Sequence, residues 1–192
     1  MPSYWVDPSG ERKLKRVKKA PKEYQTEKLV AIYPKLLGHK RKIVWFWKRS
    51  NGPGDLFGFD SKGRFLVVEF KKKVGTREGK KALSQISEAL KTNKKLSPEQ
   101  IQKHYARFRE KYLSNQTYET FEEQFRDVTG HKLDKKTDFP YSYVVASYFT
   151  YAGLQLVRTA IRRRKRGPRF VATQILDNKG KLSLVATETL TL

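Results

Sequence analysis

Hydrophobic and polar positions between residues 42 and 71 follow a pattern that predicts three strands. Each predicted strand is aromatic or β-branched and is bounded by Gly, Pro, Asn, Asp or Ser, the residues that form turns. The strands are expected at residues 42–47, 56–59 and 64–71. Residues 50–54 interrupt the pattern after the first strand, and residues 60–63 form a turn between the second and third.

Apolar side chains at helical spacing predict helices on both sides of these strands. The first helix is expected at residues 21–37, where Pro34 ends or kinks it and Gly38 stops it. A mostly polar helix follows the third strand, at about residues 81–91. The first helix and the three strands thus precede a second helix, an order that favours a layered α/β protein.

Residues 97–136 are interpreted as a helical insertion. Ser97 has the properties of an N-cap, with Pro98 at the first helical position and Gln100 completing a capping box, so a helix should run to about Leu113. A second helix in the insertion carries aromatic and aliphatic residues at helical spacing. These residues are Tyr118, Phe121, Phe125 and Val128.

The C-terminal part predicts a return to the sheet. Residues 141–148 are apolar on both faces, which is typical of a central strand covered on each side. Residues 152–166 are expected to be helical, and residues 170–176 and 182–188 form a hairpin. The fold class is therefore α/β, with a mixed sheet flanked by helices. Residues 1–20 are interpreted as a basic N-terminal arm, and residues 21–192 as one domain.

The charge of the chain indicates a polyanionic partner. It carries 42 Lys and Arg against 19 Asp and Glu, a formal net charge of +23. Neutralising phosphates with release of counterions drives binding to nucleic acids, so a nucleic acid is the expected partner. An anionic membrane surface and a basic ribosome-associated role are the alternatives.

The absence of cysteine excludes disulfides and zinc sites built from thiolates. No signal peptide and no run long enough to cross a bilayer are visible, so we expect no membrane association. The expected location is cytoplasmic, associated with the nucleoid, or nuclear in a eukaryote.

The turn between the second and third strands decides which side chains meet. If residues 61–63 form a three-residue loop, with Gly63 in the left-handed conformation, then Asp60 faces Arg64. The same register places Asp55 opposite Glu69, with Lys71 on the same face of the sheet. A two-residue loop would send the two carboxylates to opposite faces.

Two carboxylates so close repel each other unless a proton or a cation lies between them. Hard oxygen ligands of this kind suit Mg²⁺ or Mn²⁺, which can also bind a substrate phosphate. Exposed acids in surface ion pairs are the simpler alternative. Against it, Glu69 lies among Val67, Val68 and Phe70, where an unused charge would be costly.

These residues resemble the signature of the PD-(D/E)xK nuclease superfamily. Pro53-Gly54-Asp55 matches its first element and Glu69-Phe70-Lys71 its second. The chain is most similar to NucS-type and RecB-like endonuclease catalytic domains, whose first helix resembles residues 23–37. A glutamine often found on the helix after the hairpin corresponds to Gln85. The resemblance implies a restriction-endonuclease-like αβββαβ core; the insertion and the C-terminal hairpin depart from it.

The resemblance also implies a metal site. Asp55, Glu69 and the Phe70 carbonyl would bind Mg²⁺ or Mn²⁺, and Glu27 would complete or support the site from the first helix. Glu23 lies one turn earlier on the same helical face and is the alternative to Glu27.

Roles for two further residues follow from the resemblance. Lys71 would orient or help deprotonate the attacking water, and Gln85 would hold a water or a backbone phosphate. The expected function is metal-dependent hydrolysis of phosphodiester bonds in DNA, and a homodimer is compatible with it. A catalytically inactive nucleic-acid-binding protein of the same fold, or a basic RNA-binding structural protein, would also fit the sequence.

Basic and aromatic residues outside the signature have candidate roles of their own. The expected phosphate contacts are Lys72, Lys73, Lys80, Lys81, Arg162, Arg163, Arg164, Lys165 and Arg166. The arginine run also lies at a helix C-terminus, where positive charge is favourable in any case. Trp45, Phe46 and Trp47 are expected in the core. The three histidines, His39, His104 and His131, are expected at the surface or in turns.

Overall fold

The computed structural model describes residues 15–16, 23–93, 95–113, 117–163, 168–178 and 181–190. The predicted basic arm lies outside these residues except for Lys15–Arg16, which form the short strand β1. No helix in the described residues has the length and apolar character needed to cross a membrane.

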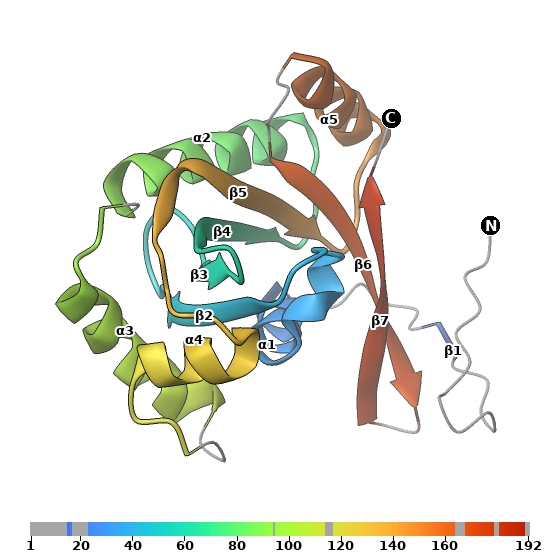
Figure 1. The fold of residues 1–192 in the computed structure, drawn as a ribbon. Coiled ribbons are helices and arrows are strands. Elements are labelled where there is room, and N and C mark those ends of the chain that lie inside the picture. The colour runs from blue at the N-terminus through green and yellow to red at the C-terminus, as the bar shows by residue number, and fades with distance from the viewer. Residues whose placement is uncertain are drawn as a thin grey trace.

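The described strands form one mixed sheet in the order β1-β6-β5-β4-β3-β2, with β7 paired to β6 (Figure 1). β2, β3 and β4 are antiparallel neighbours, whereas β5 is parallel to both β4 and β6. The strands after β1 are β2 (Ile43–Lys48), β3 (Leu56–Asp60), β4 (Arg64–Lys71), β5 (Lys136–Ala146), β6 (Arg169–Asn178) and β7 (Lys181–Leu190). The predicted central strand, β5, therefore lies between two parallel partners, as its two apolar faces required.

Helices cover both faces of the sheet (Figure 1). They are α1 (Glu23–Ile32), the 3-10 helix η1 (Pro34–Leu37), α2 (Thr76–Asn93), α3 (Pro98–Tyr112), α4 (Phe121–Thr129) and α5 (Tyr151–Arg163). Pro34 separates α1 from η1, as its missing N–H predicts. The order α1, β2, β3, β4, α2, β5 confirms the expected αβββαβ core and the α/β class.

Two boundaries differ from the prediction by five residues. α2 begins at Thr76, five residues before the predicted start, and β5 begins at Lys136. Lys136 pairs with Arg64, and the pairing then skips to Leu66 opposite Tyr141. This irregular step lies just before the apolar run, so the hydrophobic pattern could not reveal the first residues of β5.

Strand alternation divides the core into two layers. Phe57, Phe65 and Val67 face α2, with Ala82, Ile86 and Ala89 packed above them. Leu56, Leu66, Val68 and Phe70 face α1 and η1, with Val30, Leu36 and Leu37 on that side. Trp45 and Phe46 are buried as predicted, at 2% and 0% exposure.

The helical insertion packs on the edge strand β2. α3 begins with the predicted capping box at Ser97 and Gln100, and α4 has a second one at Thr120 and Glu123. Tyr105 and Phe121 are buried in the same layer as Phe46. The insertion therefore protects a sheet edge that would otherwise expose unpaired backbone groups.

The β3–β4 hairpin has the predicted register. Leu56 pairs with Val68 and Phe59 with Phe65, which is the parity of a three-residue loop. Gly63 takes a positive φ of 72°, and a Cβ there would lie 1.7 Å from the backbone oxygen of Asp134. Gly63 is thus required by its conformation and by the close approach of the chain that enters β5.

Substitution of Gly63 by alanine should be more costly than the same change at Gly130. Both glycines have positive φ, but a Cβ at Gly130 meets nothing within 4 Å. Gly130→Ala should therefore lower the free energy of unfolding by only about 1–2 kcal/mol, the cost of the left-handed conformation. Gly63→Ala adds a backbone clash and should cost at least about 1 kcal/mol more. Urea unfolding measures both; equal losses would contradict the packing described for Gly63.

Candidate active site

Two hydrogen bonds cross the open end of the β3–β4 hairpin and fix the predicted carboxylates. Asp55 lies one residue before β3, and its Oδ2 accepts from the backbone N–H of Phe70 at 2.6 Å. Glu69 lies in β4, and its Oε2 accepts from the backbone N–H of Gly54 at 3.0 Å. Because each carboxylate is held by the strand that carries the other, the two side chains stay together at this end of the sheet.

The regular ladder ends just before Asp55. Leu56 and Val68 form the last pair, and the N–H of Asp55 then donates to the Val68 carbonyl rather than pairing with Glu69. This local departure leaves the Phe70 N–H available to the Asp55 carboxylate. Asp55 and Glu69 therefore lie close together, as predicted. They are joined by hydrogen bonds from side chain to backbone and do not form a regular cross-strand pair.

Gly54 permits the close approach that this arrangement needs. Its φ is +78°, and a Cβ would lie 2.6 Å from the ring of Phe57 and 2.9 Å from Val67. With no side chain there, the backbone of residue 54 descends onto the sheet and its N–H reaches Glu69. This is a physical reason for glycine directly before the aspartate.

The electrostatics of the pair favour a bound cation or proton. Glu69 is 1% exposed. Burial, followed by the charge of Glu69, raises the pKa of Asp55 from 3.8 to about 7, against the hydrogen bond from Phe70. Burial likewise raises the pKa of Glu69, against the hydrogen bond from Lys71. Burial therefore disfavours the charged form of each carboxyl group, and the charge of Glu69 adds to this at Asp55, so two negative charges are unfavourable here without a partner.

Lys71 supplies part of the compensating charge. Its Nζ lies 2.5 Å from Oε1 of Glu69, and its side chain is 16% exposed. The Lys71 ammonium group therefore contacts the Glu69 carboxylate, and its side chain remains partly exposed to solvent.

The first helix brings both candidate glutamates to the same end of the sheet. Oε2 of Glu23 accepts from the backbone N–H of Lys72 at 3.0 Å, directly after β4. Glu27 is 8% exposed, and its charge contributes to the raised pKa of Asp55. The charge of Glu23 acts in the same way on Glu69. The geometry thus places Glu23 beside the β4 exit and Glu27 on the Asp55 side.

Lys48, which the sequence analysis did not single out, pairs with Glu27. Its Nζ lies 2.7 Å from Oε2 of Glu27. Burial alone would lower the pKa of Lys48, but the hydrogen bond and charge of Glu27 raise it, so the ammonium stays charged. The only signal in the sequence was its position at the end of the first strand.

Gln85 lies on the side of α2 that faces the sheet. It is one turn before Ala89, which is fully buried and would meet a Cβ placed on Gly54 at 3.0 Å. The Gln85 Oε1 atom is buried and accepts no hydrogen bond from the described residues. A buried amide oxygen without a donor is costly, so this position suits a water or ligand group.

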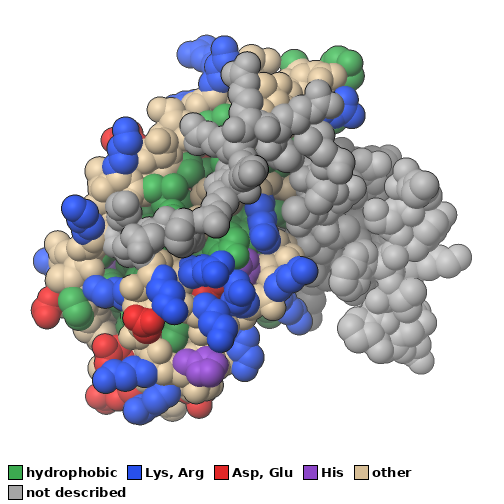
Figure 2. All heavy atoms as spheres, turned by 45° about the horizontal axis from the view of Figure 1, so that its top comes forward, with side chains coloured by type: hydrophobic (Ala, Val, Ile, Leu, Met, Phe, Trp, Pro, Cys, Tyr) green, Lys and Arg blue, Asp and Glu red, His purple; other side chains and the backbone are tan. Residues whose placement is uncertain are grey.

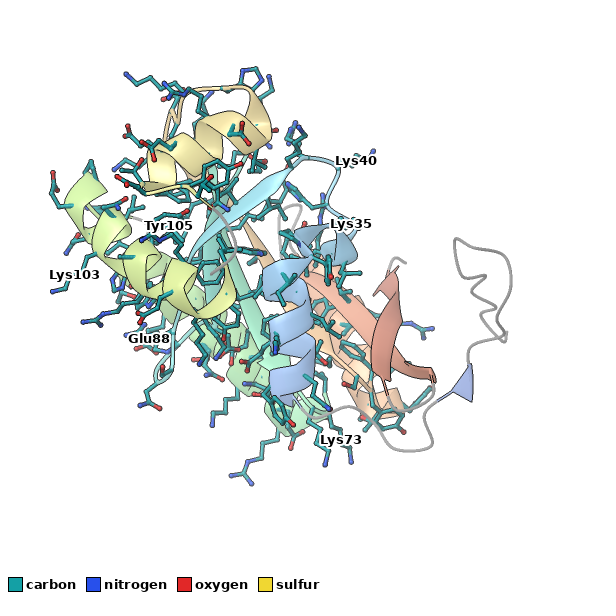
Figure 3. All side chains as sticks on the ribbon, turned by 90° about the horizontal axis from the view of Figure 1, so that it is seen from below. Lys35, Lys40, Lys73, Glu88, Lys103 and Tyr105 are labelled. Carbon is teal, nitrogen blue, oxygen red and sulfur yellow. The ribbon has the colours of Figure 1, made fainter. Side chains whose placement is uncertain are left out.

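The structure describes the side chains of only some of the predicted phosphate-binding residues. Lys72, Lys73, Lys80 and Lys81 are all exposed, after β4 and on the first turns of α2. Lys73 projects into solvent beside the start of α1 (Figure 3). Arg162 and Arg163 end α5, but their side chains lie outside the description, as do Arg164, Lys165 and Arg166 entirely. Figure 2 shows a face where blue Lys and Arg side chains outnumber red acids.

A second group of cations comes from the insertion. His104 of α3 stacks on Trp47, with ring centroids 3.9 Å apart, and the Arg49 guanidinium lies 5.2 Å from the Trp47 ring centre. Burial and then the charges of Arg107, Lys103 and Arg49 lower the pKa of His104. Lys103 points away from the sheet, whereas Tyr105 points into it (Figure 3). His104 was expected at the surface; it is in fact half-buried against β2.

Arg49 links this group to the carboxylates. Its guanidinium donates to the Pro53 carbonyl at 3.2 Å, and its backbone N–H donates to the Asp55 carbonyl at 2.9 Å. The loop that presents Gly54 and Asp55 is therefore held by a cation at its base.

The donor set fits a divalent cation held by few protein ligands. Among the described residues, no three His, Asp or Glu side chains come together as a ready metal-binding group. Asp55 and Glu69 supply two hard carboxylates; burial raises the pKa of both, and the charge of Glu69 raises that of Asp55 further. Mg²⁺ in proteins often has one or two carboxylate ligands, and waters and phosphates complete its octahedron.

Comparisons with known proteins add little to this geometry. The sequence matches no protein-family model and no curated protein. One solved structure, a repair endonuclease from Pyrococcus abyssi, is similar with a TM-score of 0.34 and 15% sequence identity. The match covers 74% of this chain and 45% of that protein, so this chain spans less than half of its length. A likeness at this level does not bear on activity.

The raised pKa of Asp55 predicts a stability that falls as the pH rises. Between its ordinary value of 3.8 and about 7, the folded protein keeps a proton that the unfolded chain releases. The free energy of unfolding should therefore fall across this window, by at most about 1.4 kcal/mol per pH unit. Asp55→Asn should flatten the fall. Urea unfolding at several pH values, with a chelator present, measures it.

Asp134→Asn is the matched control because that side chain is 80% exposed. It should leave the slope unchanged. A wild-type protein whose stability is constant between these pH values, or a slope that survives Asp55→Asn, would contradict the description of the buried pair.

Proposed function

We propose that the protein is a metal-dependent nuclease that hydrolyses phosphodiester bonds in DNA. The observation that carries the proposal is the pair of half-buried Asp55 and buried Glu69, held by backbone hydrogen bonds from Phe70 and Gly54 and flanked by Lys71. In a chain with a net charge of +23, a concentrated acidic site has a clear use, which is to hold a cation against a phosphate.

Each residue then has a defined part. Asp55 and Glu69, with the Phe70 carbonyl, would hold Mg²⁺ or Mn²⁺. The metal ion, when bound, would lower the pKa of a water molecule and neutralise the phosphate. Lys71 orients the attacking water and stabilises negative charge that develops on the phosphate oxygens. Gln85 offers its unpaired amide oxygen to a water.

The surrounding cations supply substrate affinity rather than chemistry. Lys72, Lys73, Lys80 and Lys81 are exposed on the segment that leaves Lys71, where a DNA backbone entering the site would meet them. Arg49 donates to the Pro53 carbonyl of the Asp55 loop, and Lys103 and Arg107 lie near His104. Phosphate contacts from these cations would bind DNA without regard to sequence and would weaken with salt.

Substitution of the site residues should abolish cleavage. With Mg²⁺ or Mn²⁺ present, Asp55→Ala, Glu69→Ala and Lys71→Ala should each reduce the rate of cleavage of labelled DNA by about 10²–10⁴-fold. A chelator should have the same effect on the wild type. The changes remove a metal ligand or the cation beside it, so binding of DNA should be much less affected.

Lys136→Ala is the control for loss of a cation, because Lys136 is exposed and pairs only with Asp134 among the described residues. It should cleave at the wild-type rate. Cleavage that survives both Asp55→Ala and Lys71→Ala would overturn the proposal. Strong binding without any cleavage by the wild type would indicate an inactive nucleic-acid-binding protein of this fold.

Glu27 should matter more than Glu23 for metal use. Glu27 is buried, and its charge raises the pKa of Asp55 even though it also pairs with Lys48, whereas Glu23 is bonded to the backbone N–H of Lys72. Glu27→Gln should raise the Mg²⁺ concentration for half-maximal cleavage by about tenfold or more, the usual cost of losing a supporting ligand. Glu23→Gln should change it much less. The reverse ranking would assign the supporting role to Glu23.

A further inference from the structure

A second cluster of basic side chains lies at the opposite end of the sheet from Asp55 and Glu69. Arg64 is the first residue of β4 and Arg169 the first of β6. β5 runs parallel between them and carries Tyr141 and Tyr143. β4 has eight residues at about 3.3 Å each, so Arg64 lies more than about 20 Å along the strand from Lys71.

Strand alternation directs these side chains to one face. Leu66, Val68, Tyr143 and Val171 all belong to the layer under α1 and η1. Arg64 and Arg169 precede Leu66 and Val171 by two residues, so they share that face. Arg41, two residues before the buried Ile43 of β2, reaches the same place. It lies 3.4 Å from the Tyr141 hydroxyl.

Three guanidinium groups converge on the two tyrosines. Arg64 donates to the Tyr141 hydroxyl at 2.8 Å, and Arg169 donates to the Tyr143 hydroxyl at 3.4 Å. The guanidinium carbons of Arg64 and Arg169 also lie 5.5 and 5.1 Å from the centre of the Tyr141 ring. Arg64, Arg169 and Tyr141 are half-buried, and the side chain of Arg41 is 34% exposed. The cations are held in place yet still reach solvent.

Among the described side chains, the one acid in this cluster is Asp60, and both of its carboxylate oxygens already have partners. Asp60 is fully buried, and its Oδ1 accepts from the backbone N–H groups of Lys62 and Arg64 at 2.9 and 3.0 Å. Its Oδ2 lies 3.3 Å from Nε2 of His39 and 3.5 Å from Arg41. Burial alone would raise the pKa of Asp60, but the bonds from His39 and the backbone lower it, so it stays ionised.

His39 lies between Asp60 and Tyr143 in this arrangement. Its ring was expected at the surface, but its side chain is 2% exposed. Its Nε2 lies 3.3 Å from Oδ2 of Asp60, and its Nδ1 lies 2.6 Å from the Tyr143 hydroxyl. Burial raises the pKa of Tyr143 to about 12, against the charge of Arg169, so this hydroxyl keeps its proton. The cluster therefore holds three fixed cations against one anion.

The uncompensated charge and its geometry define a ligand class. Neither Arg64 nor Arg169 forms an ion pair with a described acidic side chain. The guanidinium groups of both lie near the Tyr141 ring. Guanidinium groups bind phosphate bidentately, and a phosphate has enough oxygens and charge for several arginines at once. A single carboxylate has two oxygens and one charge, which would leave the cluster positive.

We propose that Arg41, Arg64 and Arg169, framed by Tyr141 and Tyr143, form a phosphate-binding site at the end of the sheet opposite the candidate active site. The phosphate could belong to the end of a nucleic-acid strand or to a free phosphate compound. The site does not depend on the proposed hydrolysis, because none of its residues touches Asp55, Glu69 or Lys71 in the described contacts.

The test is a calorimetric titration of the full chain with three probes. These are inorganic phosphate, an oligonucleotide with a 5′-phosphate, and the same oligonucleotide without it. The double variant Arg64→Gln, Arg169→Gln should bind inorganic phosphate at least about tenfold more weakly than the wild type, the usual effect of losing charged hydrogen bonds. Arg126→Gln, an exposed arginine of α4, should bind it as the wild type does.

The two oligonucleotide titrations identify the source of the phosphate. Tighter binding of the phosphorylated strand, lost in the double variant, would assign the site to a strand end. Equal binding of both strands, with inorganic phosphate still bound, would assign it to a free phosphate compound. Cleavage of the unphosphorylated strand is measured separately, so failure of this site and failure of the proposed nuclease activity give different results.

A second measurement needs no variant and so does not depend on how the variants fold. Phenylglyoxal modifies accessible arginines, and mass spectrometry identifies them. Inorganic phosphate should protect Arg41, Arg64 and Arg169 but not Arg126. If phosphate neither binds nor protects these residues, or if the double variant binds it unchanged, the cluster only packs the sheet end and the proposal is wrong.

Discussion

The candidate site depends on one constraint: two carboxylates must share a buried position at the open end of a hairpin. Each is held by a backbone N–H from the opposite strand, Phe70 for Asp55 and Gly54 for Glu69. Burial raises both pKa values, the charge of Glu69 raises that of Asp55 further, and Lys71 offsets part of the charge. The left-handed Gly63, the close approach at Gly54 and the covering helix α2 all serve this pairing.

The register of this hairpin could be predicted from the sequence because it depends on local chemistry. A glycine at the third loop position fixes the parity of the turn, and parity decides which face each side chain takes. The buried strand β5 was likewise evident from its two apolar faces. The exact contacts of Asp55 were not, because its bond to Phe70 requires the ladder to end one residue early.

Contacts between elements that are distant in the chain could not be predicted from the sequence. Lys48 meets Glu27 only because α1 packs against the end of β2, and no periodicity reports that. His39 looked like a turn residue, yet it is buried because Asp60 and Tyr143 offer partners on both ring nitrogens. The arginine cluster joins residues 41, 64 and 169, which the antiparallel pairing of β2, β3 and β4 and the parallel pairing of β4, β5 and β6 bring to one end of the sheet.

We propose that Asp55 and Glu69 together hold a divalent cation. Calorimetric titration of Mn²⁺ into the chelator-treated protein, without nucleic acid, tests this proposal without any substrate. The wild type should bind the ion at one site, and Asp55→Asn and Glu69→Gln should each weaken binding by at least about tenfold, whereas Asp134→Asn should not. Equal binding by the wild type and both variants, or none by the wild type, would contradict the account.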